Sequence, residues 1–140
     1  MEMEILESKK EHLGALFLEG FIAAHNSHEL LFKTIREENR KQEKLSVSLV
    51  YLSNAYTNFK LANEYILANL DVLEERQEFT DTFVDFNSFN REFLRSAATD
   101  HSHSHTDNYF LKFADSFKNA ASILDIDKEN FFYNLATDNS

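Results

Sequence analysis

The sequence predicts an all-α protein: an elongated antiparallel helical bundle of three to five helices, with one long central helix at about residues 44–96. Three observations lead to this class. Proline is absent and glycine occurs only twice in 140 residues, so the turn formers that hairpin-rich β-folds need are missing. Apolar residues recur at helical spacings over long stretches. The length suits one domain, and we expect a single helical domain over residues 1–140.

The first helix is expected over residues 3–25, where apolar residues fall near one face. Gly14 and Gly20 lie inside it, where each costs about 1 kcal/mol relative to alanine. We interpret these glycines as points of close approach to another helix. A second helix is expected at about 28–42, after a start that resembles a capping box at Asn26.

The central segment carries the clearest periodicity. Its first half holds a seam of alternating four- and three-residue spacings: Leu45, Leu49, Leu52, Tyr56, Phe59, Asn63, Ile66, Leu70 and Leu73. This spacing is typical of coiled-coil packing, and the one fully polar member, Asn63, is expected to set the register. Its second half holds a phenylalanine stripe: Phe79, Phe83, Phe86 and Phe93. The cap-forming residues at 80–82 and 87–88 are candidate breaks in the helix.

A polar, histidine-rich loop is expected at residues 98–105. Two further helices follow it, at about 106–124 and 127–136. The imidazoles of His101, His103 and His105 alternate along this loop and form a conceivable zinc, nickel or copper site. Such binding would be physiological or adventitious, and a plain polar loop is the main interpretation. No resident cofactor is expected.

The segment Ser27-His28-Glu29-Leu30 resembles the Ser-His-Glu-Leu core of the phosphoacceptor helix in sensor histidine kinases. The resemblance covers fewer than ten residues and implies phosphotransfer through His28. It ends where the family's Arg-Thr-Pro is replaced by Leu31-Phe32-Lys33. His25 and His28 are also three residues apart, so with Glu29 or Glu11 they could share a metal on one helix face, although solvent-exposed histidines near a helix start are the simpler interpretation.

Charge and composition exclude several classes of function. The formal net charge is −10, which disfavours direct binding of nucleic acid because that depends on basic residues. The absence of cysteine excludes disulfides, thiolate metal sites and a cysteine nucleophile. The most apolar stretch, Leu13–Ala24, contains Glu19 and is too short to span a bilayer. The acidic start at Met1–Glu4 is unlike a secretory signal, so we expect a soluble, cytoplasmic protein without membrane insertion.

We therefore expect a non-enzymatic helical interaction protein, such as a small subunit, adaptor or chaperone-like accessory. It would bind itself or another helical protein through this face: Leu49, Leu52, Tyr56, Phe59, Asn63, Ile66, Leu70, Phe79, Phe83, Phe86 and Phe93. One alternative is an acidic inhibitor or nucleic-acid mimic that binds a basic groove through Asp71, Glu74, Glu75, Glu78, Asp81 and Asp85. A second alternative is a metal-binding or histidine phosphotransfer bundle.

Overall fold

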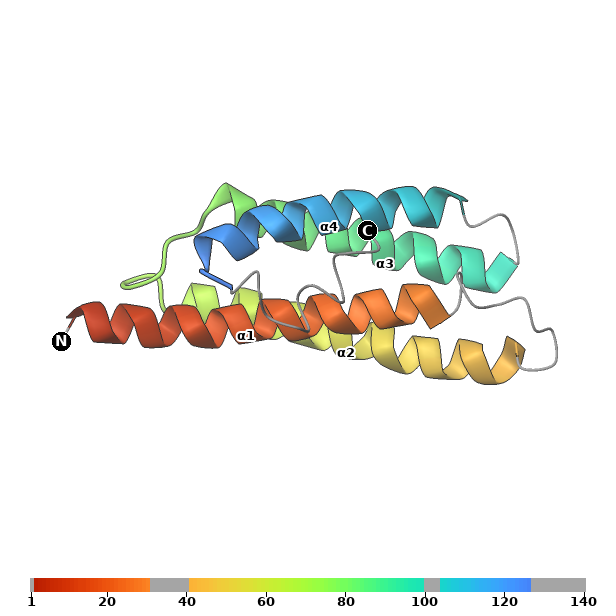
Figure 1. Ribbon diagram of the computed structural model, residues 1–140, viewed down its shortest axis with the longest axis horizontal. Helices are drawn as coiled ribbons and strands as arrows, with labels where there is room; N and C mark the ends of the chain where they lie inside the picture. The colour runs from red at the N-terminus through yellow and green to blue at the C-terminus, as the bar shows by residue number, and fades with distance from the viewer. Residues whose placement is uncertain (1, 31–40, 100–103, 127–140) are drawn as a thin grey trace.

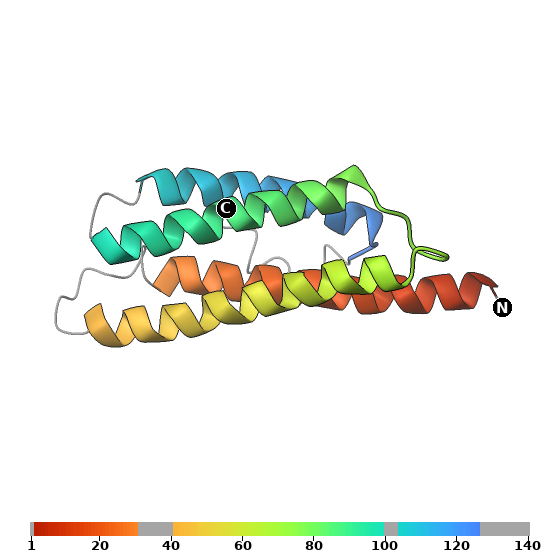
Figure 2. The same cartoon turned by 180° about the vertical axis from the view of Figure 1, so that it is seen from behind.

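The chain folds as an all-α bundle in the computed structural model, which describes residues 2–30, 41–99 and 104–126. The helices are α1 (Glu2–His28), α2 (Lys41–Ala68), α3 (Gln77–Thr99) and α4 (Ser104–Ile123). Figure 1 shows α1 beside α2 in one layer and α3 beside α4 in the other, with successive helices antiparallel. The reverse view in Figure 2 places α2 and α3 on the same side of the bundle. The predicted elongated, antiparallel all-α class is confirmed.

The single helix predicted over residues 44–96 is wrong, because the chain turns back between α2 and α3. The turn, residues 69–76, contains neither glycine nor proline. Within the turn, the backbone amides of Val72 and Leu73 donate to the Asn69 carbonyl. A distant contact adds to these, because Nζ of Lys9 donates to Oδ1 of Asn69 at 2.5 Å, and Leu73 is buried. Folding back allows the phenylalanine stripe of α3 to pack in the core of its own chain.

Other predicted boundaries also shift. The candidate breaks at 80–82 and 87–88 lie inside α3, where the Thr82 hydroxyl donates to carbonyl oxygens of Glu78 and Ser116 and does not cap a helix. The predicted start at Asn26 lies inside α1, which continues to His28. The helix predicted at 127–136, and most of the one predicted at 28–42, lie outside the described residues.

The predicted heptad seam divides into a buried half and an exposed half. Leu52, Phe59, Ile66 and Leu73, spaced seven apart, are buried, whereas Leu49, Tyr56, Asn63 and Leu70 are exposed. The core positions that accompany the buried half are small side chains, Ser48, Ala55 and Ala62, which also repeat every seven residues. The spacing predicted for the seam therefore holds, but the buried face of α2 consists of one half of the seam together with the small residues beside it.

Small side chains and hydroxyl contacts join the helices within each layer. Buried Ala23, Ala24 and Ser27 lie on α1, and the Ser27 hydroxyl donates to the Ser48 carbonyl of α2 at 2.9 Å. Between α3 and α4, the buried hydroxyls of Ser96 and Thr106 lie 2.8 Å apart. Short side chains allow helix axes to approach closely, so each layer is a tightly packed helical hairpin.

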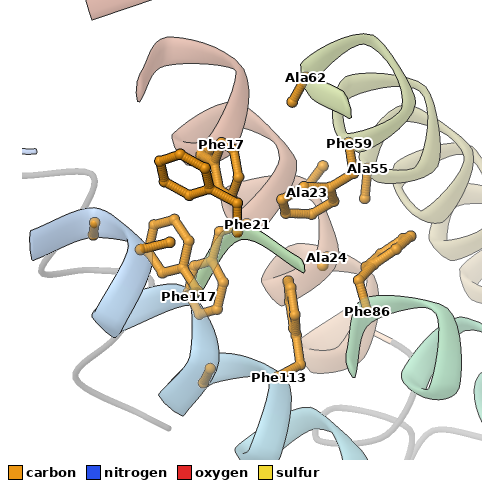
Figure 3. Close-up of a cluster of buried hydrophobic side chains, with 14 of the residues drawn as sticks. Phe17, Phe21, Ala23, Ala24, Ala55, Phe59, Ala62, Phe86, Phe113 and Phe117 are labelled. Carbon is orange, nitrogen blue, oxygen red and sulfur yellow. The ribbon is translucent and has the colours of Figure 1, made fainter. Parts of the chain in front are cut away.

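Phenylalanine rings fill the space between the two layers (Figure 3). The rings of Phe21 on α1 and Phe117 on α4 stack with centroids 4.2 Å apart. Phe59 of α2 contacts rings from all the other helices: Phe17, Phe83, Phe86 and Phe113. Each fully buried ring contributes on the order of 1.5–3 kcal/mol, so this aromatic layer is the main source of cohesion between the hairpins.

The two glycines of α1 provide a matched test of this packing. A Cβ atom on Gly20 would lie 2.8 Å from Cε2 of Phe59, whereas one on Gly14 would meet its nearest neighbour, Ile126, at 3.6 Å. The close approach expected at Gly20 is therefore confirmed, and Gly14 makes only ordinary contacts.

We expect Gly14→Ala to raise the free energy of unfolding by up to about 1 kcal/mol. Gly20→Ala should lower it by about 1–2 kcal/mol, because the clash outweighs the gain in helix propensity.

Urea unfolding of both variants, followed by circular dichroism, measures this difference. Equal unfolding midpoints for the two variants would contradict the assigned contact between Gly20 and Phe59.

Candidate interaction surface

The outward side of α2 is the most apolar exposed surface among the described helices. Six large hydrophobic side chains of α2 are exposed: Val47, Leu49, Val50, Tyr56, Leu61 and Leu67. By contrast, α3 exposes Val84 and Leu94 in this class, and α4 exposes Tyr109 and Leu111. A helix that carries apolar residues around its whole circumference is usually covered on every side, so the exposed side of α2 requires an explanation.

The same part of α2 also lacks charge. Residues 45–59 contain no charged side chain, and Lys60 is the only one between Leu45 and Asn63. The whole chain carries 38 charged residues, 27% of its length, so this stretch departs sharply from the rest. Depletion of charge at the centre of a surface patch is the compositional mark of protein–protein interfaces.

One strip of this surface has regular coiled-coil spacing. We define the α2 seam as the exposed residues Leu49, Ser53, Tyr56, Lys60, Asn63 and Leu67. Their successive spacings are four, three, four, three and four, which place them on one side of a helix. The seam combines Leu49, Tyr56 and Asn63 of the predicted heptad with Ser53, Lys60 and Leu67, and it contains no carboxylate.

The α2 seam borders a groove between α2 and α3. A cavity of about 160 Å³ opens there, lined by Tyr56, Phe59, Lys60, Asn63, Phe83, Phe86 and Asn87. Three of these residues come from α3: half-buried Phe83, buried Phe86 and exposed Asn87. The groove between α1 and α2 differs, because its lining includes Glu19, Asn26 and Asn54. The groove on the α3 side of α2 is therefore the one of the two without a carboxylate in its lining.

The structure separates the eleven predicted interaction residues into two sets. Six are buried in the core of the bundle: Leu52, Phe59, Ile66, Phe79, Phe86 and Phe93. The remaining five are accessible to different degrees: Leu49, Tyr56, Asn63 and Leu70 are exposed and Phe83 is half-buried. Four of these five, all but Leu70, belong to the α2 seam or to the groove beside it. Leu70 lies in the turn after α2.

The acidic residues of the inhibitor alternative do not form one free face. Asp71, Glu74 and Glu75 are exposed in the turn, but Asp85 is buried and accepts a hydrogen bond from the Ser116 hydroxyl. Arg76 lies within the set, with Nη2 at 3.8 Å from Oε2 of Glu78. The acidic surface is therefore smaller than the sequence indicated, and this alternative stays a prediction.

Two histidines lie buried near the end of α1. His28 is only 3% exposed; its Nε2 lies 2.6 Å from Oδ1 of Asp107 on α4, and its ring stacks on Phe110 with centroids 4.6 Å apart. Phosphotransfer needs an accessible ring nitrogen, so this burial weighs against the role implied by the kinase resemblance. His25 is also buried, and its Nδ1 has no hydrogen-bond partner among the described residues. The expectation of solvent-exposed histidines at a helix start is wrong for both.

The predicted bounds of the histidine-rich loop, 98–105, are wrong at both ends, because α3 extends to Thr99 and α4 begins at Ser104. His101 and His103 lie outside the described residues, whereas His105 is exposed in the first turn of α4. Within the described ranges, no three histidine or carboxylate side chains are grouped as metal ligands. The metal hypothesis for the loop stays a prediction.

No protein-family model, curated protein or solved structure matches the chain. No helix within residues 2–30, 41–99 and 104–126 combines the length and apolar character that crossing a bilayer requires.

Sequence reasoning missed Ser53, Lys60 and Leu67 as members of a surface strip. The available signal was their spacing of seven residues, and the uncharged run at residues 45–59 includes Ser53. A helix that is exposed to water on one side normally carries charged residues on that side. A long stretch without charge therefore indicates that other protein surfaces cover the helix on both sides.

Burial of His25 predicts a pH effect on stability. Desolvation lowers its pKa below the usual 6.5, and the negative charge of Glu29 opposes part of that shift. Above about pH 6.5, His25 is neutral in both the folded and the unfolded state, and stability is complete. As the pH falls below 6.5, the unfolded state takes up a proton on His25 before the folded state does. The free energy of unfolding therefore falls until the pH reaches the depressed pKa of the folded state. We expect His25→Leu to lose less unfolding free energy than the wild type between about pH 7.5 and 5.5, measured by urea denaturation. Parallel losses in both proteins would refute this assignment.

Proposed function

We propose that this protein is a non-enzymatic helical interaction protein that binds a helical surface, on a second copy or on another protein, through the α2 seam. The observation that carries the proposal is the exposure of Leu49, Tyr56 and Leu67 along one strip of α2 that contains no carboxylate. Their exposure leaves apolar surface in water at a cost of about 25 cal/mol per Å², which a partner would remove.

The shape of the surface supports a helix as the partner. The α2 seam has the alternating spacing with which one helix packs side chains between those of another. It borders a groove that already contains the half-buried ring of Phe83 and is free of carboxylates in its lining. Apolar anchors at helical spacing in a groove are the usual elements of helix recognition.

The polar clusters offer less support for catalysis. The contact between His28 and Asp107 lies in the core between α1 and α4, and the contact between Ser116 and Asp85 joins α3 to α4. These groups hold helices together, and each has a packing role that accounts for its position. The proposed class therefore includes subunits, adaptors and accessory proteins, with cytoplasmic location as a further expectation.

Two leucines of α2 allow a matched test. Leu67 belongs to the α2 seam and is 50% exposed; Leu61 lies on another side of α2 and is 47% exposed. The tagged wild type, Leu67→Glu and Leu61→Glu would be isolated from cells that naturally express the protein, and intact assemblies weighed by native mass spectrometry. We expect Leu67→Glu to lose the assemblies and Leu61→Glu to keep them, because only the first places a charge in the contact.

Two results would reject the proposal. One is a wild-type chain that is recovered only as a monomer. The other is an assembly that survives Leu67→Glu unchanged while circular dichroism shows the variant to be folded.

A further inference from the structure

We infer that the partner of the α2 seam is a second copy of this chain, packed so that the two α2 helices run antiparallel about a two-fold axis near residue 58. This inference rests on the proposed function and names its partner. It follows from the order of side chains along the seam, from the charge of the chain and from the length of α2.

The α2 seam is complementary to itself only when it is reversed. In an antiparallel pair whose facing residue numbers sum to 116, Leu49 meets Leu67 of the other copy, and Ser53 meets Asn63. The central layers then bring Lys60 to the ring of Tyr56. Leucine pairs therefore lie at each end of the interface, and the Ser53 hydroxyl faces the Asn63 amide. The ammonium group of Lys60 lies on the aromatic face of Tyr56, a contact that contributes about 0.5–1 kcal/mol at an exposed site.

The parallel arrangement lacks this complementarity. A parallel pair places each residue against its own counterpart, so Lys60 would face Lys60 of the other copy. Opposed like charges destabilise helix pairs. Asn63 facing Asn63 could exchange amide hydrogen bonds, so the opposed lysines and the missing contact between Lys60 and Tyr56 are what disfavour the parallel pair. The residue order of the seam therefore favours the antiparallel orientation.

The net charge restricts where two copies can meet. Each copy carries a formal charge of −10, so contact through faces rich in carboxylates would be repulsive. The α2 seam contains no carboxylate, and its one charged residue, Lys60, is basic. Two copies that meet there keep their acidic surfaces apart. This repulsion also predicts that salt, which screens it, strengthens the dimer.

The size of the shared surface predicts a weak dimer. In this pairing the two α2 helices overlap over residues 48–68, about 30 Å, and a strip about 10 Å wide on each copy buries on the order of 600 Å² in total. An area of this size is typical of weak, transient association. We therefore expect dissociation at tens to hundreds of micromolar.

Sedimentation of the purified chain from about 1 to 200 μM tests the dimer directly. We expect a monomer–dimer equilibrium that tightens when NaCl is raised from about 50 to 300 mM. Leu67→Glu should weaken the dimer at least ten-fold, whereas Leu61→Glu should change it less than two-fold. Lys60→Arg should retain dimerisation and Lys60→Glu should reduce it, because only the first preserves a cation over the ring.

Cysteine cross-linking then tests the orientation, since the natural chain contains no cysteine. In the antiparallel pair, Leu49→Cys faces Leu67→Cys, whereas position 49 lies about 27 Å from position 49 of the other copy. Mildly oxidised mixtures of the two variants should form disulfide-linked heterodimers, and each variant alone should not.

The possible failures of the two proposals differ. A purified chain that stays monomeric at about 200 μM overturns the second-copy inference; if native assemblies with another protein are still lost in Leu67→Glu, the proposed function survives. Cross-linking of Leu49→Cys with itself overturns the antiparallel orientation. A dimer that is insensitive to Leu67→Glu overturns the inference as well, because it uses a different surface.

Discussion

The ring of Phe59 is the contact on which the arrangement of the four helices depends. It lies against Gly20 of α1, where a side chain would not fit, and it reaches rings of both α3 and α4. Short side chains draw α1 close to α2, and rings hold that pair away from α3 and α4. The bundle therefore has tight hairpins and a thick aromatic layer between them. Its cohesion comes from apolar burial and packing, with hydroxyl contacts supporting each hairpin.

This division also creates the candidate surface. Rings between the layers keep α2 and α3 apart along one side, so the groove beside Tyr56 and Asn63 is open to a volume of about 160 Å³. Single exposed apolar residues are common on helices that also carry many charged side chains. On a stretch with no charge before Lys60, Leu49 and Tyr56 expose apolar side chains on the strip that borders this groove. The core packing and the proposed binding surface thus depend on the same aromatic layer.

Periodicity and composition were sufficient to predict the helical class, but local signals did not reveal the turn after α2. That turn combines local hydrogen bonds to the Asn69 carbonyl with the contact between Lys9 and Asn69, 60 residues apart in sequence, and with the burial of Leu73. The heptad predicted a seam correctly in spacing, yet the buried face could be chosen only once Ser48, Ala55 and Ala62 were seen against α1. Spacing indicates which side chains share a stripe; the direction that the stripe faces is decided by packing against other helices.

The order of the helices has a consequence for how the chain folds. Each tight hairpin joins helices that are neighbours in sequence, so its formation closes only a short loop and costs little chain entropy. Bundles dominated by such local contacts fold within microseconds to milliseconds. The contact between Phe59 and Phe113 connects residues from different hairpins and closes a much longer loop. We therefore expect docking of the hairpins to limit the folding rate, and mutations in the aromatic layer to affect that rate more than mutations at helix ends.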